Sequence, residues 1–190
     1  MKKDNYHITP IQTLYKNRLY RSRLEAKWAC FFDLFNWQYE YEPFDLNGWS
    51  PDFLLKLPCG ELTNIYNVLV EVKPDSMINI NLYERLYKAN EGTDYSLLIL
   101  KEFPIDKEGS YSFGFSGKMP LTKTESFFFE VNGKKYKEFS TSLICQRESG
   151  EYSIMPYDNP ESDDKHWRIL GDNEIQEAWD IASNNVMFMK

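Results

Sequence analysis

Two carboxylates and one amine stand at the ends of neighbouring apolar segments, in Pro51-Asp52 and in Glu71-Val72-Lys73. Because side chains alternate along a strand, Glu71 and Lys73 should share one face. A hairpin between the two segments should then bring Asp52 beside residues 71 to 73. Two carboxylates in this position suit Mg²⁺, which prefers oxygen ligands, and the Val72 carbonyl is a further candidate ligand. If such a metal ion activates a water for hydrolysis, Lys73 is a candidate for orienting or deprotonating that water, or for stabilising charge that develops in the transition state.

Each of these segments also has a simpler explanation. An acidic and a basic residue at the end of an apolar strand are costly to bury, but they form an ordinary ion pair where the strand runs out into solvent. A Pro-Asp dipeptide can simply begin a strand after a turn. Glu71 and Lys73 alone favour the simpler explanation, and the addition of Asp52 favours a functional site.

Glu25 is a third candidate acid, and it lies in a predicted helix. Ser22-x-x-Glu25 matches a capping box, in which both side chains bond to backbone amides at the start of a helix. Leu24, Trp28 and Phe31 follow at helical spacing, which predicts a helix through about residue 36. Glu25 is therefore either a cap alone or a cap that also holds a metal-bound water at the sheet edge.

Three basic residues surround Glu25 in the sequence. Arg21, Arg23 and Lys27 are candidate contacts to substrate phosphates, which would be independent of base sequence. The same residues fit a solvated helix face equally well. The sequence does not separate these two interpretations.

The segments around these residues predict an α/β layer with a mixed sheet. After the first helix, the pattern predicts strands at residues 37–42, 52–57, 65–73 and 95–100 and a helix at 80–90. A turn is expected at residues 58–60. Strands followed by helices in this order are typical of a sheet flanked by helices. Residues 104–160 predict only small strands, and residues 173–183 predict an amphipathic helix.

The composition is that of a folded protein without a signal for export or membrane insertion. The chain has 190 residues, 42% of them hydrophobic, and its three cysteines lack any zinc-binding spacing. Its basic start is not followed by the apolar run of a signal peptide, and no apolar stretch approaches the roughly 20 residues that span a bilayer. We therefore expect a soluble cytoplasmic protein without a membrane partner.

The charge is unevenly distributed along the chain. The net charge of −7 argues, taken alone, against a nucleic-acid partner. However, residues 16–27 hold five basic residues against one acid, whereas residues 158–180 hold eight acids against two basic residues. The basic stretch could bind a phosphate backbone locally. The acidic C-terminal stretch is a candidate docking surface for a protein partner.

Four motifs together resemble the PD-(D/E)xK nuclease superfamily, in particular its bacterial and phage-encoded, restriction-endonuclease-like members. They are YRSRLEAKWA at residues 20–29, YEYEP at 39–43, PDF at 51–53 and VEVKP at 70–74. The resemblance covers about residues 13–100. Four motifs in the right order form a more specific signal than any one of them. Nothing after residue 103 can be aligned with this family.

The resemblance implies a restriction-endonuclease-like core in residues 1–103, with a mixed four-stranded sheet flanked by helices. Residues 104–190 would form a small β-rich extension that ends in a helix and packs on this core within one structural domain. Asp52 and Glu71 would bind Mg²⁺ or Mn²⁺ together with the Val72 backbone. Lys73 would be the catalytic lysine, and Glu25 matches the acid of the first helix.

The activity implied by the resemblance is hydrolysis of DNA phosphodiester bonds by a metal-activated water, in a phage, recombination, repair or defence context. Two alternatives remain open: a nuclease fold that binds nucleic acid or protein without cleavage, and a ribonuclease. The presence of Glu25, Asp52, Glu71 and Lys73 favours cleavage, since a site that only binds has no chemical need for all four. The sequence does not choose between a monomer and a homodimer.

Overall fold

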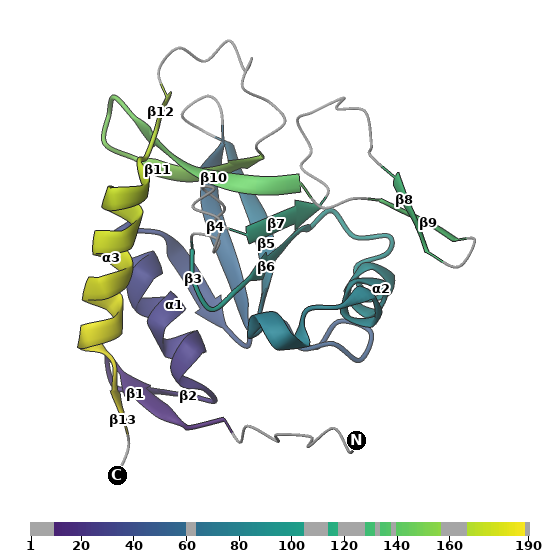
Figure 1. Ribbon diagram of the computed structural model, residues 1–190, viewed down its shortest axis with the longest axis horizontal. Helices are drawn as coiled ribbons and strands as arrows, with labels where there is room; N and C mark the ends of the chain where they lie inside the picture. The colour runs from purple at the N-terminus through teal and green to yellow at the C-terminus, as the bar shows by residue number, and fades with distance from the viewer. Residues whose placement is uncertain are drawn as a thin grey trace, which may run out of the picture.

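A computed structural model describes residues 10–59, 64–104, 114–117, 128–131, 134–137, 140–156 and 167–188 (Figure 1). The described chain begins with a hairpin of β1 (Thr13–Tyr15) and β2 (Arg18–Tyr20). The hairpin turns at Lys16 and Asn17, which both have positive φ, as a tight two-residue hairpin turn requires. The second strand leads directly into the first helix.

Helix α1 (Arg23–Leu34) begins where the capping pattern predicts, but only half of the predicted capping box forms, because the Glu25 carboxylate accepts from hydroxyl groups and not from the Ser22 backbone amide. The Ser22 hydroxyl accepts a hydrogen bond of 3.1 Å from the Glu25 backbone amide. The helix ends at Leu34 with Phe35 as its C-cap, and Asn36 then takes a left-handed conformation that is common after a helix. The start of α1 is thus fixed by a side-chain cap.

Eight of the described strands form one mixed sheet in the order β11-β10-β7-β6-β5-β4-β3, with β12 also paired to β10. Their bounds are β3 (Gln38–Tyr41), β4 (Phe53–Cys59), β5 (Asn64–Val72), β6 (Ser96–Leu100), β7 (Gly114–Gly117), β10 (Ser140–Arg147), β11 (Tyr152–Pro156) and β12 (Trp167–Ile169). A separate hairpin pairs β8 (Phe128–Val131) with β9 (Lys134–Lys137). The sheet extends beyond the four strands implied by the family resemblance, because the strands after residue 103 continue it beyond β6.

The beginning of β4 and the end of β5 lie side by side. Strands β5 and β6 are parallel and are connected through η1 (Asp75–Met77) and helix α2 (Ile80–Ala89), so both end at one edge of the sheet. Strand β4 runs antiparallel to β5, with Phe53 opposite Val70, and therefore begins at this same edge. The residues before β4 and after β5 therefore lie close together at this edge.

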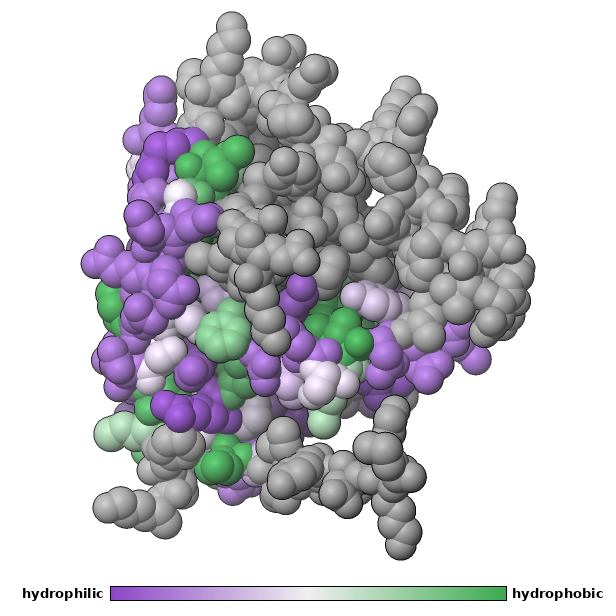
Figure 2. Space-filling view, viewed as in Figure 1, coloured by the Kyte–Doolittle hydropathy of each residue, from purple (hydrophilic) through white to green (hydrophobic). Residues whose placement is uncertain are grey.

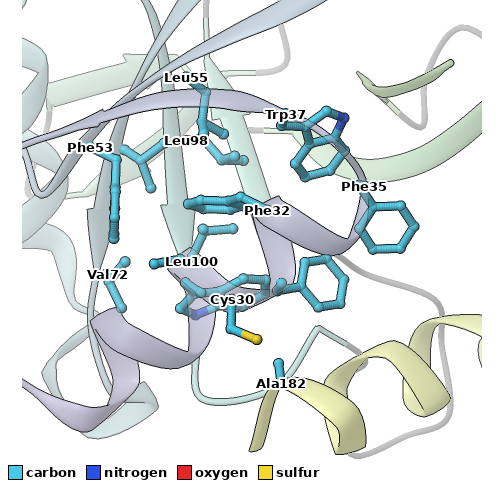
Figure 3. Packing of buried hydrophobic residues seen from close by; sticks show 14 of the residues in the cluster. Cys30, Phe32, Phe35, Trp37, Phe53, Leu55, Val72, Leu98, Leu100 and Ala182 are labelled. Carbon is cyan, nitrogen blue, oxygen red and sulfur yellow. The ribbon is translucent and has the colours of Figure 1, made fainter. Parts of the chain in front are cut away.

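Helices cover both faces of the sheet, with α1 and α3 (Asp172–Asn185) on one side and α2 on the other (Figure 1). On the α1 side, Phe32 packs against Phe53 with ring centroids 5.2 Å apart, and it faces Leu98 and Leu100 (Figure 3). On the α2 side, Leu69 and Ile99 belong to a second buried cluster. Burial of both faces explains why β6 and the second half of β5, from Val68 to Val72, are mainly apolar.

The C-terminal helix joins the N-terminal half of the chain. Trp179 of α3 packs on Trp28 of α1 with ring centroids 4.6 Å apart, and β13 (Met187–Phe188) pairs with β1.

The outer side of α3 exposes acidic residues such as Glu177 and Asp180, and Figure 2 shows mainly hydrophilic side chains along it. Other acids of the predicted docking surface, at residues 158–164, lie outside the described residues. No helix in the described part of the chain is long and apolar enough to cross a membrane.

The predicted α/β layer with a mixed sheet is confirmed, and the helices and strands predicted at residues 22–100 and 173–183 have ends within two residues of those observed. The predicted turn at residues 58–60 is wrong, because β4 continues through Pro58 to Cys59, which pairs with Asn64. Proline lacks a backbone donor but has a φ that an extended strand accepts, so it does not by itself end the strand.

Candidate active site at the edge of the sheet

Asp52 lies immediately before β4, beside the end of β5. Its backbone amide donates to the Val70 carbonyl at 2.9 Å, and its Oδ2 accepts from the Val72 amide at 2.7 Å. The residue is only 1% exposed. The backbone of β5 therefore fixes the orientation of this carboxylate, in the position expected from the hairpin.

Lys73 follows β5, and its ammonium group contacts both buried acids. Its Nζ lies 2.8 Å from Glu71 Oε1 and 3.5 Å from Asp52 Oδ2. It also donates to the Val72 carbonyl at 3.1 Å, while the Lys73 backbone amide donates to Leu100 at 2.9 Å. The structure thus brings together the two carboxylates, the lysine and the carbonyl that the sequence singles out.

Burial shifts the pKa values of Asp52 and Lys73 in opposite directions, whereas the negative charge of Glu71 raises both. Burial, together with the charge of Glu71, raises the pKa of Asp52 to about 7, although Lys73 and the Val72 amide act in the other direction. Burial lowers the pKa of Lys73, but the carboxylates of Asp52 and Glu71 outweigh burial and raise it above its usual value. Lys73 is therefore a cation at neutral pH in this arrangement.

Glu71 is held by two side chains that the sequence analysis does not identify. The indole N–H of Trp49 donates to Glu71 Oε2 at 2.8 Å, and Arg85 of α2 donates to Oε1 at 3.2 Å. A tight turn with positive φ at Asn47 and Gly48 folds Trp49 back toward the sheet. The Asn-Gly pair is the one sequence signal for this turn, and nothing in the sequence of α2 marks Arg85.

Glu25 is both a cap partner and a member of the site. Its Oε1 accepts from the Ser22 hydroxyl at 2.8 Å, and its Oε2 accepts from the Tyr41 hydroxyl at 2.6 Å. Burial and this hydrogen bond to Glu25 raise the pKa of Tyr41, so its phenol stays protonated and continues to donate. Glu25 as a whole is 7% exposed. Tyr41 therefore orients Glu25 from the neighbouring β3, a role that the sequence does not predict.

Arg21 connects Glu25 to Asp52. Its Nη2 lies 2.5 Å from Asp52 Oδ1, and its Nε lies 2.7 Å from Glu42 Oε1 and 3.9 Å from Glu25 Oε2. Burial lowers the pKa of Arg21, but the nearby carboxylates of Asp52 and Glu25 raise it by more than burial lowers it. The guanidinium therefore stays charged. About half of the Arg21 side chain is exposed, so it can move without unpacking the core.

A cleft of about 690 Å³ opens on this cluster. Asp52 and Lys73 line it, and so do the three predicted phosphate-binding residues, Arg21, Arg23 and Lys27. The Lys27 ammonium also lies 5.3 Å from the centre of the Trp179 ring, and burial lowers its pKa. Glu71 is not part of the lining, so Asp52 is the acid of the pair that faces the cleft directly.

The donor atoms at this edge fit a hard divalent cation, which takes oxygen ligands and commonly one or two protein carboxylates. Asp52, Glu71 and the Val72 carbonyl supply such oxygens. No group of three or more His, Cys, Asp or Glu side chains within the described ranges is arranged to hold a metal ion. The Asp52 and Glu71 oxygens accept instead from Arg21, Lys73, Arg85, Trp49 and the Val72 amide. A cation would thus have to replace part of these contacts, and the contact made by the half-exposed Arg21 is the easiest to replace.

Comparison of the chain with family models, curated proteins and solved structures finds no match. The interpretation of the site therefore rests on its residues and their geometry.

Proposed function

We propose that this chain is a metal-dependent nuclease of the PD-(D/E)xK type that hydrolyses phosphodiester bonds of DNA. The observation that carries the proposal is the position of Lys73, whose Nζ contacts the buried carboxylates of Asp52 and Glu71 beside an open cleft. The order α1, β3, β4, β5, α2 and β6 supports the restriction-endonuclease-like core of the same proposal. A purely structural ion pair would not need two buried acids at a sheet edge.

Within this proposal, Lys73 orients the attacking water or stabilises the negative charge that develops in the transition state, because its Nζ contacts both carboxylates beside the cleft. A fixed cation beside the scissile phosphate lowers the free energy of the more highly charged transition state. Arg21 and Arg23 supply further positive charge along the cleft.

Asp52 and Glu71, together with the Val72 carbonyl, would hold the divalent cation, Mg²⁺ or Mn²⁺. When bound, the cation would polarise the phosphate and lower the pKa of water. Glu25, held by Ser22 and Tyr41, would position the attacking water from the α1 side of the cleft.

Contacts to phosphates would be made by the partly buried cations that line the cleft, and such contacts carry no sequence information. Arg23 and Lys27 are one helical turn apart on α1, which places both on one face of the helix. The resemblance to bacterial and phage-encoded nucleases extends the proposal to action in the cytoplasm of a bacterium or of a phage-infected cell, in a phage, recombination, repair or defence context.

The test is cleavage by the purified chain of supercoiled plasmid, linear duplex, single-stranded DNA and RNA, each with Mg²⁺, Mn²⁺ or EDTA. We expect cleavage of DNA that requires metal and is lost in Asp52→Asn and Lys73→Met. Matched controls are Asp45→Asn, in an exposed loop, and Lys56→Met, which removes an ion pair with Glu40 on the same sheet. Cleavage that persists in EDTA or in both site variants would contradict the mechanism.

A second candidate function is a nuclease-fold module that binds nucleic acid or protein without cleaving it. The site carboxylates already form hydrogen bonds and ion pairs with protein groups, above all with Arg21, and this favours the alternative. Metal-independent binding of DNA without cleavage of any substrate would support the module. Preferential cleavage of RNA would instead identify a ribonuclease.

A further inference from the structure

Three large apolar side chains line the same cleft as the charged cluster. Ile11, Met77 and Phe103 are exposed to 55%, 49% and 51%, and they come from three separate segments: the residues before β1, η1 and the loop after β6. Single exposed apolar residues are ordinary on a protein surface. Three that converge on one cleft from different segments call for a ligand with an apolar surface.

In nucleic acids, extended apolar surface is found on the faces of the bases. Inside a duplex these faces are covered by stacking, so that a protein in a groove meets mainly base edges and phosphates. A base released from the stack exposes its face, and aromatic and apolar side chains bind it by stacking. The cations of the cleft therefore match phosphates, while Phe103 and Met77 match an unstacked base.

The dimensions of the cleft favour the same conclusion. A volume of about 690 Å³ lies within the range of roughly 300–1,000 Å³ that is typical of pockets enclosing a small ligand. Such a hollow accommodates about one or two nucleotides of a single strand. Proteins that read a duplex instead insert a helix or a strand pair into its groove.

We propose that the cleft binds a single strand of DNA, with one base stacked on Phe103 beside Met77 and with phosphates facing Arg23 and Lys27. This inference rests on the proposed nuclease function and specifies its substrate as a single strand, whether free or released at a frayed duplex end. Phe103 is then a substrate-positioning residue of the nuclease.

The test measures binding in EDTA, where no cleavage occurs, by fluorescence anisotropy of a labelled oligonucleotide and of its blunt duplex. Wild-type protein is compared with Phe103→Ala, with the aromatic replacement Phe103→Trp, and with Tyr87→Ala. Tyr87 is a matched control because it is exposed to 45% on α2 and does not line the cleft. Thermal unfolding checks that each variant is folded, and a half-exposed Phe103 should contribute little to stability.

We expect wild-type protein to bind the single strand at least about tenfold more tightly than the duplex. Phe103→Ala should lose about tenfold in affinity for the single strand, in keeping with the stacking of one base, whereas Phe103→Trp and Tyr87→Ala should retain wild-type affinity. Equal or tighter binding of the duplex would overturn the proposal, and so would a Phe103→Ala variant that binds the single strand like Tyr87→Ala.

Failure of this inference and failure of the nuclease proposal give different results. Metal-dependent cleavage of duplex and single strand at equal rates, unchanged in Phe103→Ala, would overturn the single-strand proposal and leave the nuclease standing. Preferential, Phe103-dependent binding of the single strand with no cleavage of any DNA would support the cleft assignment and contradict the nuclease.

Discussion

The Asp52 carboxyl group is buried beside a second buried acid, Glu71, and both conditions disfavour its ionised form. Its pKa is accordingly raised from 3.8 to about 7. A carboxyl group with a higher pKa in the folded chain than in the unfolded chain contributes stability below its unfolded pKa, and this contribution is lost as the pH rises through its folded pKa. Ionisation of Asp52 should therefore lower the stability of the metal-free protein between about pH 4 and pH 7.

Asp52→Asn removes this ionisation and keeps an oxygen for the Val72 amide. Since one pKa unit corresponds to about 1.4 kcal/mol, the variant should gain up to about 4 kcal/mol in unfolding free energy relative to wild type between about pH 4 and about pH 8. Urea unfolding of both proteins in EDTA at the two pH values measures this gain. A difference between the proteins that does not change with pH would contradict the raised pKa of Asp52.

Arg21 competes with a metal ion for Asp52 Oδ1, since its guanidinium contacts that oxygen. Removing the guanidinium in Arg21→Met should therefore strengthen Mn²⁺ binding. A partly exposed ion pair contributes up to about 1 kcal/mol, so the affinity should rise by about two- to fivefold. Calorimetric titration with Mn²⁺ in the absence of nucleic acid measures it, with Arg18→Met on the same hairpin as the control. Unchanged or weaker Mn²⁺ binding in Arg21→Met would contradict the competition.

At the scale of elements, the start of α1 links the stability of a helix to the geometry of the site. Ser22 caps the helix through the Glu25 amide and also donates to the Glu25 carboxylate. Ser22→Ala should therefore lower the unfolding free energy by about 1 kcal/mol, and Ser22→Thr should restore most of it. Urea unfolding measures both variants, with the exposed Ser50→Ala as the control. A Ser22→Ala variant as stable as wild type would contradict the capping role.

Local patterns were sufficient to predict the centre of the site but not its surroundings. Strand alternation places Glu71 and Lys73 on one face, and one hairpin brings Asp52 beside them. Trp49 and Arg85 reach Glu71 from a loop and from a helix, and such contacts depend on how distant segments pack. No periodic pattern in the sequence predicts these contacts to Glu71.

The arrangement of the sheet was predictable only in part, for a related reason. The strands up to Leu100 were predicted from alternation and apolar runs, and the pairing of β4 with β5 follows from a hairpin, which is local. Strands β7 and β10 join the sheet by long-range pairing, β10 with Ser140 opposite Ser116 of β7. Short segments rich in Gly, Lys and aromatic residues show that strands are present but not which neighbours they pair with.

At the scale of the whole molecule, the C-terminal helix is part of the same packed structure as α1. Trp179 is 1% exposed and packs on both Trp28 and Phe31. Trp179→Ala should therefore destabilise the whole protein by about 3–5 kcal/mol. Ile181→Ala, on the same helix but 41% exposed, should change stability by less than about 0.5 kcal/mol.

Urea unfolding followed by far-ultraviolet circular dichroism measures both of these variants. A single transition that shifts to lower urea in Trp179→Ala would indicate that α3 unfolds together with the rest of the chain. Loss of α3 alone, with an unchanged main transition, would contradict its role in the common core.

The most direct test of the active site is the single-turnover rate of DNA cleavage in Mg²⁺ by wild-type protein, Lys73→Met and Lys56→Met. Both lysines form ion pairs with glutamates near the same sheet, but only Lys73 contacts Asp52 and lines the cleft. We expect wild-type protein and Lys56→Met to cleave at the same rate, and Lys73→Met to be slower by at least about 100-fold. Equal rates in all three proteins would contradict the proposed site.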